Sequence, residues 1–202
     1  MLQAIDGSFH SVLSLHSVRA AHRAPRHLKL MNAARRLTSQ ERPWYAEDGL
    51  RFTCSQCGNC CSGSPGYVHF TNDEGTRMAN RLGISVQAFY DRYTFEQDGL
   101  ILLKEIPSSS GLDCILLDRD EDGKGVCSVY ADRPMQCKTW PFWPENLVTE
   151  AAWEDAKAST PCAGMNTGDH HNLDLISSIS KQDAKATTQI GEEALERARA
   201  RS

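Results

Sequence analysis

The sequence predicts a small, irregular α+β domain. Short helical and short strand patterns alternate without an internal repeat, and turn-forming residues separate them. A chain of 202 residues with 40% apolar and 24% charged residues is ordinary for one globular domain with tails. We expect a tail over residues 1–40, one ordered domain over residues 41–170, and a peripheral helix or tail over residues 171–202.

Helix signals occur at two places in the first half of the expected domain. The run 71–83 begins with a capping box, in which Thr71 is followed three residues later by Glu74, and it ends at a glycine. Ser85 is placed to cap a second helix over residues 86–93. The sequence therefore predicts two consecutive short helices.

Strand signals follow on both sides of these helices. Four apolar or alternating runs indicate short strands, at residues 66–70, 100–106, 114–117 and 125–130. The last two runs flank an acidic turn, so we expect Cys114 and Cys127 to face each other across a hairpin.

The last third of the chain mixes a helical turn, an apolar wall and a weak helix. Pro134 suits the first position of a helical turn that carries Cys137. An apolar wall follows, formed by Trp140, Phe142 and Trp143. From Asp174 onward the pattern is helical but weakly amphipathic, with an interruption at Gly191.

Charge is divided unevenly along the chain. Residues 1–40 carry a net charge of +5, whereas the rest carries −9. An acidic domain argues against nucleic acid as a partner, because phosphate binding needs a basic face. We expect the basic segment to be a flexible, solvated tail; polyanion binding and an organellar transit peptide are the alternatives. No apolar run is long enough to span a bilayer and no secretory signal is indicated, so we expect a cytoplasmic protein without a membrane partner.

The eight cysteines carry the strongest chemical signal. The stretch CSQCGNCC places four of them within eight positions, and four more follow at residues 114, 127, 137 and 162. A CxxC turn can bring two sulfurs to the roughly 3.8 Å that separates the ligands of a tetrahedral zinc ion, and Gly58 allows such a turn. Because a reducing cytosol keeps thiols reduced, this spacing favours metal binding over disulfides.

The spacing leaves the partition of the thiols and the metal open. Eight thiolates could form two four-sulfur sites, or one cluster with spare or bridging ligands. The side chains of adjacent Cys60 and Cys61 tend to diverge, so we expect them to serve different ions or different sides of a polynuclear centre. A CxxCxxC loop with a remote cysteine favours an iron–sulfur cluster or iron, with zinc as the close alternative, since soft thiolates suit both.

These residues resemble the YkgJ-like cysteine-cluster family, a zinc- or iron-chelating domain of the CxxCxxCC type. The resemblance is carried by CSQCGNCC, CILL, GVCSVYADRPMQCKTWPFWP and PCAG, and it extends from about Trp44 to Gly168. It implies that the metal ligands are Cys54, Cys57, Cys60, Cys61, Cys114, Cys127, Cys137 and Cys162. A related cluster occurs in flagellin lysine methylases.

The function predicted from these features is metal binding. The sequence contains no nucleophile elbow, phosphate-binding loop or dinucleotide fingerprint, so no catalytic residues are assigned. The alternatives are an iron–sulfur oxidoreductase or electron carrier, and a protein-modifying enzyme, which only the methylase resemblance suggests. Arg133 and Lys138 flank Cys137, where each could either offset thiolate charge or form a surface salt bridge.

Overall fold

The computed structural model describes residues 42–201 and confirms the α+β class. Its α-helices are α2 (Asn72–Arg81), α3 (Val86–Tyr93), α4 (Met135–Thr139), α5 (Glu150–Ser159) and α6 (Leu173–Ala200). Single 3-10 turns are η1 (Asn59–Cys61), η2 (Tyr130–Asp132) and η3 (Pro144–Leu147). The expected flexible tail over residues 1–40, with its alternatives, lies outside the described residues.

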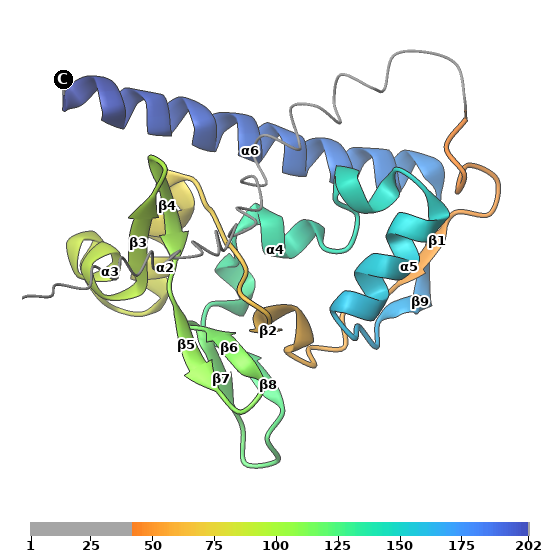
Figure 1. Ribbon diagram of the computed structural model, residues 1–202, viewed down its shortest axis with the longest axis horizontal. Coiled ribbons are helices and arrows are strands. Elements are labelled where there is room, and N and C mark those ends of the chain that lie inside the picture. Colours follow the sequence, from red (N-terminus) through yellow and green to blue (C-terminus); the bar gives the residue numbers. More distant parts are fainter. Residues whose placement is uncertain (1–41, 202) are drawn as a thin grey trace, which may run out of the picture.

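The strands are short, and every pair among the described residues is antiparallel. They are β1 (Leu50–Phe52), β2 (Ser62–Gly63), β3 (Thr94–Gln97), β4 (Leu100–Leu103), β5 (Glu105–Ser108), β6 (Gly111–Cys114), β7 (Leu117–Arg119), β8 (Gly125–Cys127) and β9 (Met165–His171). They form one three-stranded sheet, in the order β2-β6-β5, and three two-stranded sheets, β1-β9, β3-β4 and β7-β8. Figure 1 shows these small sheets distributed around the centre of the molecule rather than joined in one layer.

The first hydrophobic core lies between α2, α3 and the β3-β4 hairpin. The Thr71 side chain accepts a hydrogen bond from the Glu74 backbone, and the Glu74 side chain accepts one from the Thr71 backbone, which confirms the capping box. Ser85 caps α3 as expected. The buried residues of this core are Phe70, Met78, Ala79, Phe89, Leu103, Leu116 and Val129.

The second core lies between α5, the β1-β9 pair and the start of α6. Trp140 and Phe142 of the expected apolar wall are buried in it, and Trp143 packs against it. The other buried residues of this core are Tyr45, Leu50, Leu147, Trp153, Ala156, Met165 and Ile176. Each core therefore occupies one side of the molecule, at the left and the right of Figure 1.

Helix α6 differs from the expectation of a weak helix interrupted at Gly191. It is continuous over 28 residues and passes through Gly191. Its buried stripe explains the continuity, because Ile176 lies in the second core and Ile190 is also buried farther along the helix. Between them the buried Asp183 accepts a hydrogen bond from Thr139 of α4, at 2.8 Å. Tertiary contacts thus outweigh the modest cost of one glycine within a helix.

All four strand predictions were wrong in part: the run 114–117 contains a turn between β6 and β7, and β8 covers only the first half of the run 125–130. Residues 66–70 form a single bridge, from His69 to Leu102, instead of a strand. The side chain of Gln136 takes the place of a neighbouring strand there, since it bonds both the Tyr67 carbonyl and the His69 amide. The run 100–106 is divided into β4 and β5 on either side of Lys104, whose backbone bonds to Tyr93 and Ile115 instead.

The expected cross-strand pairing of Cys114 with Cys127 was also wrong. In the β7-β8 hairpin Cys127 is opposite Leu117, whereas Cys114 ends β6 opposite Glu105 of β5. The chain turns at Ile115 and Leu116, between β6 and β7, because the buried Leu116 packs into the first core there. The two cysteines therefore lie on neighbouring sheets rather than on one hairpin.

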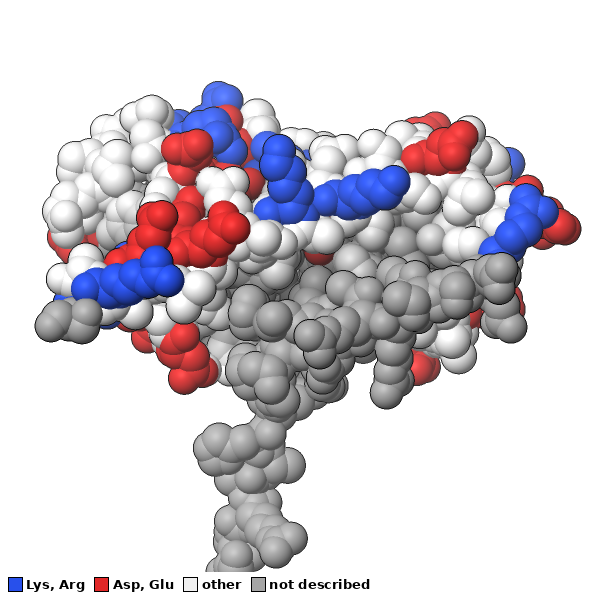
Figure 2. Space-filling view, turned by 90° about the horizontal axis from the view of Figure 1, so that it is seen from above, with Lys and Arg blue, Asp and Glu red and all other residues white. Residues whose placement is uncertain are grey.

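The described surface carries side chains of both charges. On the face over α6 in Figure 2, acidic and basic side chains are interspersed. Among residues 42–201, no helix is both long enough and apolar enough to cross a bilayer.

Candidate metal centre

Four cysteines lie on the loop between β1 and β2. Gly58 has the left-handed conformation expected of a tight turn, with φ of 78°, and its carbonyl accepts the Cys61 amide at 2.9 Å. The single 3-10 turn η1 follows directly and carries Cys60 and Cys61. Cys54 and Cys60 are exposed, and Cys57 and Cys61 are half-buried.

The loop is seated on the hairpin β7-β8 by contact between two glycines. A Cβ atom built on Gly125 would lie 2.8 Å from the Gly58 Cα and 3.2 Å from the Cys57 carbonyl oxygen. No side chain larger than hydrogen fits between the loop and the start of β8. Since Gly125 begins the strand that ends at Cys127, this contact brings the loop next to a remote cysteine.

A buried carboxylate fixes the exit of the same loop. Asp113 of β6 accepts hydrogen bonds from Ser108 at 2.9 Å and from Arg119 at 3.0 Å, and Arg119 also donates to the Ser62 hydroxyl at 3.2 Å. Burial opposes ionisation of Asp113, but hydrogen bonds from Ser62, Ser108 and Arg119 hold the pKa of its carboxyl below the ordinary value. The network therefore joins β2, β5, β6 and β7 beside the cysteines.

The four remote cysteines come from both sides of the molecule. Cys114 ends β6 and Cys127 ends β8, and both pack against the first core. Cys137 lies on α4, as predicted, and Cys162 lies on the turn between α5 and β9, where it packs against the second core. All four are half-buried free thiols.

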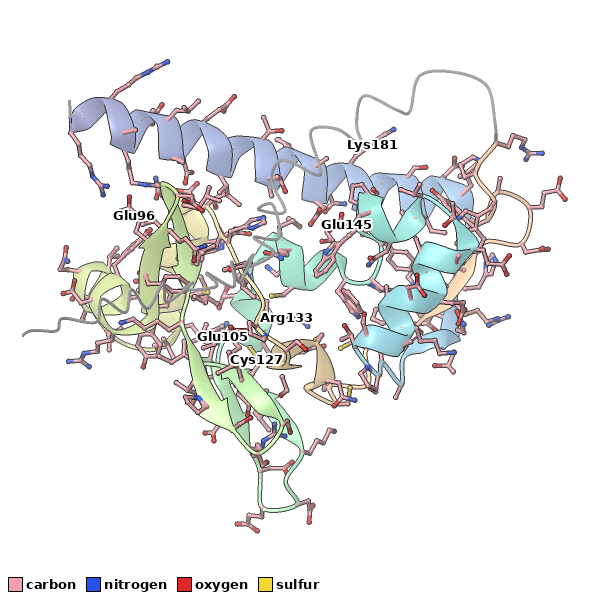
Figure 3. All side chains as sticks on the ribbon, in the orientation of Figure 1. Glu96, Glu105, Cys127, Arg133, Glu145 and Lys181 are labelled. Carbon is pink, nitrogen blue, oxygen red and sulfur yellow. The ribbon has the colours of Figure 1, made fainter. Side chains whose placement is uncertain are left out.

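Five of the thiols lie within electrostatic range of one another. The sulfurs of Cys60 and Cys61 lie 3.8 Å apart. Around this pair, the charges of Cys60, Cys61, Cys114, Cys127 and Cys137 affect one another. Figure 3 labels Cys127 in this region, together with Glu105 and Arg133, below α4 and next to the cysteine loop.

Burial and mutual repulsion keep most of these thiols protonated. Burial is the largest cause that raises the pKa of Cys114, to about 11, and that raises the pKa of Cys127 and of Cys137. The hydrogen bond between Cys61 and Cys60 lowers the pKa of Cys60 to about 7 and raises the pKa of Cys61. Binding a cation here would therefore displace protons from several thiols.

The remaining three cysteines are attached to the same region by other contacts. Cys54 lies beside the phenol of Tyr130, and Cys57 contributes the carbonyl that contacts Gly125. The Asn59 side chain, on the cysteine loop, donates to the Pro161 carbonyl at 2.7 Å and so ties the Cys162 turn to the loop.

The donor set fits a soft cation, although the side chains are not gathered around a single point. Within residues 42–201, no three His, Cys, Asp or Glu side chains are arranged to hold an ion as they stand. The 3.8 Å between the Cys60 and Cys61 sulfurs nevertheless matches the roughly 3.8 Å between thiolates on a tetrahedral zinc ion. The expectation that these side chains diverge was wrong, since their sulfurs lie within van der Waals contact.

Comparison with known families agrees with this donor set. The family described as "CxxCxxCC: Putative zinc- or iron-chelating domain" matches residues 53–163. This range includes all eight cysteines, the first of which, Cys54, is its second residue. This chain belongs to the CxxCxxCC family. Its cysteine domain is thus a metal-chelating one, for zinc or iron, and metal ions are its partners. No solved structure matches the chain.

Several residues that shape the CxxCxxCC domain were missed in the sequence. In the sequence, Asp113 and Arg119 are only polar positions within alternating strand patterns. Gly125 follows an acidic turn, where a glycine is common and indicates no particular role. Their roles depend on which strands are neighbours. The register of Cys114 opposite Glu105, for example, places a carboxylate next to a thiol and could be found only from the pairing of β5 with β6.

Proposed function

We propose that this protein chelates iron or zinc in a polynuclear thiolate centre, with an iron–sulfur cluster as the favoured form. The observation that carries the proposal is the convergence of five thiols from four separate segments. A mononuclear tetrahedral site uses four ligands, so a fifth thiol within the same region supports a shared or bridging ligand. Iron–sulfur clusters are held by thiolates in the same way.

The ligands fall into an inner and an outer set in this proposal. The inner set contains the five interacting thiols, Cys60, Cys61, Cys114, Cys127 and Cys137. The outer set contains Cys54 and Cys57, on the cysteine loop itself, and Cys162, whose turn is joined to that loop by the hydrogen bond from Asn59 to the Pro161 carbonyl. A bound metal would supply a cation that stabilises the thiolates and links the two cores through their cysteines.

The domain limits and the compartment belong to the same proposal. The cysteine domain covers residues 41–170, and residues 171–202 are a peripheral helix or tail, of which α6 contacts both α4 and β4. Eight free thiols and no disulfide among the described residues support a reducing compartment, and hence a cytoplasmic location.

Electron transfer is a second candidate function. Cys54 and Cys60 are exposed although their neighbours are half-buried, so one edge of the centre would be accessible to a redox partner. A protein-modifying activity is a weaker candidate, because it rests on the resemblance to the lysine methylases alone.

Anaerobic purification followed by elemental analysis, sulfide analysis and absorption spectroscopy tests the proposal. A brown protein with acid-labile sulfide supports an iron–sulfur centre, and a colourless protein with more than one zinc ion supports a polynuclear zinc centre. Exchange of Cys137 for Ser should reduce the metal content, whereas a wild-type protein that retains no iron or zinc under these conditions overturns the proposal.

A further inference from the structure

Helix α4 is too short to hold Cys137 in place by itself. It has five residues, Met135–Thr139, and isolated helices shorter than about 12–15 residues are marginal in water. Figure 1 shows α4 near the centre of the molecule, below α6, and the buried Asp183 of α6 accepts a hydrogen bond from its last residue, Thr139. The position of Cys137 therefore also depends on what holds the first turn of α4.

A carboxylate from another helix holds this first turn. One oxygen of Glu74, Oε2, accepts the Thr71 backbone N–H at 2.9 Å and so completes the capping box of α2. The other oxygen, Oε1, accepts the Met135 backbone N–H at 2.7 Å, across 61 positions of the chain. Met135 is the first residue of α4, and the side chain of Pro134 before it has no group that could accept this N–H. One carboxylate thus caps two helices.

Burial makes both hydrogen bonds of Glu74 hard to replace. Glu74 is 4% exposed, so little water can take over a lost bond. Hydrogen bonds to an ionised carboxylate are about twice as strong as those between neutral groups. The guanidinium of Arg77 lies farther away, with 3.9 Å between its Nη2 atom and Oε1 of Glu74. Loss of the carboxylate would therefore release the N–H group at the start of α4.

The next residue of α4 is held by the same part of the chain. The buried Gln136 side chain donates to the Tyr67 carbonyl at 2.9 Å and accepts the His69 backbone N–H at 3.0 Å. Cys137 follows directly, at the third position of a turn whose first two residues, Met135 and Gln136, are fixed by these contacts. The geometry of the first turn thus determines where the thiol of Cys137 can lie.

We propose that Glu74 is a positioning residue of the metal centre, which fixes the backbone before Cys137 so that its thiol is presented to the ion. This inference rests on the proposed function, in which Cys137 is a ligand. Metal–ligand distances tolerate deviations of only about 0.2 Å. Residues that orient a ligand from outside the coordination shell typically change metal affinity by roughly 10- to 100-fold when they are replaced.

The first test compares two substitutions within the capping box of α2. Zinc affinity is measured under anaerobic conditions by competition with a chromophoric chelator. Glu74→Gln has one acceptor oxygen for two N–H groups, and glutamine is accepted in a capping box, so the bond to Met135 should be lost and the affinity should fall by roughly 10- to 100-fold. Thr71→Ala is the matched control, because it removes the hydroxyl that accepts the Glu74 N–H at 3.2 Å but retains both bonds of the carboxylate. It should leave the affinity nearly unchanged.

The second test removes the same hydrogen bond from its donor side. Met135→Pro has no backbone N–H, and proline is tolerated at the first position of a helix. Pro134 already has ψ of 151°, which a residue before proline prefers. Met135→Ala is the matched control, since it also lacks the methionine side chain but keeps the N–H. Met135→Pro should weaken zinc binding as Glu74→Gln does, and Met135→Ala should not.

A double-mutant cycle separates the positioning of Cys137 from a general loss of structure. If Glu74 acts through Cys137, Glu74→Gln should cost little further affinity in a Cys137→Ser protein. Independent effects on the structure would instead add. Circular dichroism of each variant checks that it is folded.

The outcomes distinguish this inference from the function on which it rests. A wild-type protein that binds none of zinc, cobalt and iron overturns the proposed function, and this role with it. Wild-type binding that is weakened equally by Glu74→Gln and Thr71→Ala, or by neither, overturns the role of Glu74 alone, and so does full additivity in the cycle with Cys137→Ser. Should Glu74→Gln fail to fold, equal affinities in Met135→Pro and Met135→Ala would overturn it.

Discussion

The contact between Gly58 and Gly125 gives a sharp test of how the cysteine loop is positioned. Exchange of Gly125 for Ala would place a Cβ 2.8 Å from the Gly58 Cα. Because carbon atoms in contact are normally about 3.5–4.0 Å apart, the loop and β8 would have to separate by roughly 0.7–1.2 Å. Gly125 is not in the left-handed region, so alanine adds no backbone strain and the effect is purely steric.

The size of this displacement sets the expected loss of affinity. Metal–ligand distances tolerate deviations of only about 0.2 Å, so the shift is large for a loop that supplies four thiols. Inserting a methyl group into a packed contact typically costs about 1–3 kcal/mol. If that cost falls on the metal-bound state, zinc affinity decreases by roughly 5- to 150-fold, at about 1.4 kcal/mol for each factor of ten.

The assay is chelator competition on anaerobically prepared protein, with circular dichroism as a check on folding. Gly66→Ala is the matched control, because Gly66 also lacks a left-handed φ and its Cβ would meet the Glu105 carboxylate at an ordinary 3.6 Å. Equal affinities in Gly125→Ala and Gly66→Ala would show that the glycine contact does not position the loop.

Three other predictions concern stability. Thr139→Val removes the hydroxyl that donates to the buried Asp183, so it should lower the free energy of unfolding, measured in urea, by about 1–3 kcal/mol. Thr188→Val is the control, because it removes a hydroxyl from an exposed position of α6 and should have little effect. Removal of metal with a chelator should lower the midpoint of thermal unfolding by on the order of 20 °C, because a structural metal can supply about 10 kcal/mol of folding free energy. An unchanged midpoint of thermal unfolding would contradict a structural role of the metal. The bidentate hydrogen bonds from Arg201 lower the pKa of Glu96, so this contact should hold at neutral pH and be lost as the pH falls through that lowered pKa. The protection factors of the amides in the last turn of α6, taken relative to the intrinsic exchange rate at each pH, should then fall. In Arg201→Gln they should already be low at neutral pH and should not change in this way.

Helices with local signals were predictable, whereas segments with distant partners were not. The capping box at Thr71 and the cap at Ser85 are interactions within one turn, and both helices begin where predicted. Residues 66–70 were predicted as a strand, but their backbone is shared between a single bridge to β4 and the Gln136 side chain, which is far along the chain. The continuity of α6 likewise depends on burial of Ile176 and Ile190 against different neighbours.

The same distinction between local and distant contacts applies to the candidate metal centre. The spacing of the first four cysteines and the turn at Gly58 are local features, and the structure contains the turn. Which remote thiols approach them depends on the packing of β6, β8 and α4, and no spacing rule gives that arrangement. The closeness of the Cys60 and Cys61 sulfurs was not indicated by their adjacent positions in the sequence.

The attachment of the Cys162 turn to the loop has a consequence for biosynthesis. The bond from Asn59 to the Pro161 carbonyl joins residues that are synthesised far apart in time. While residues after about 160 remain within the ribosome, the emerging polypeptide offers seven of the eight cysteines and lacks the support of the second core. If Cys162 is a metal ligand, as we propose, the ligand set is complete only after that residue has left the ribosome, so an arrested or truncated chain would enclose a bound ion incompletely.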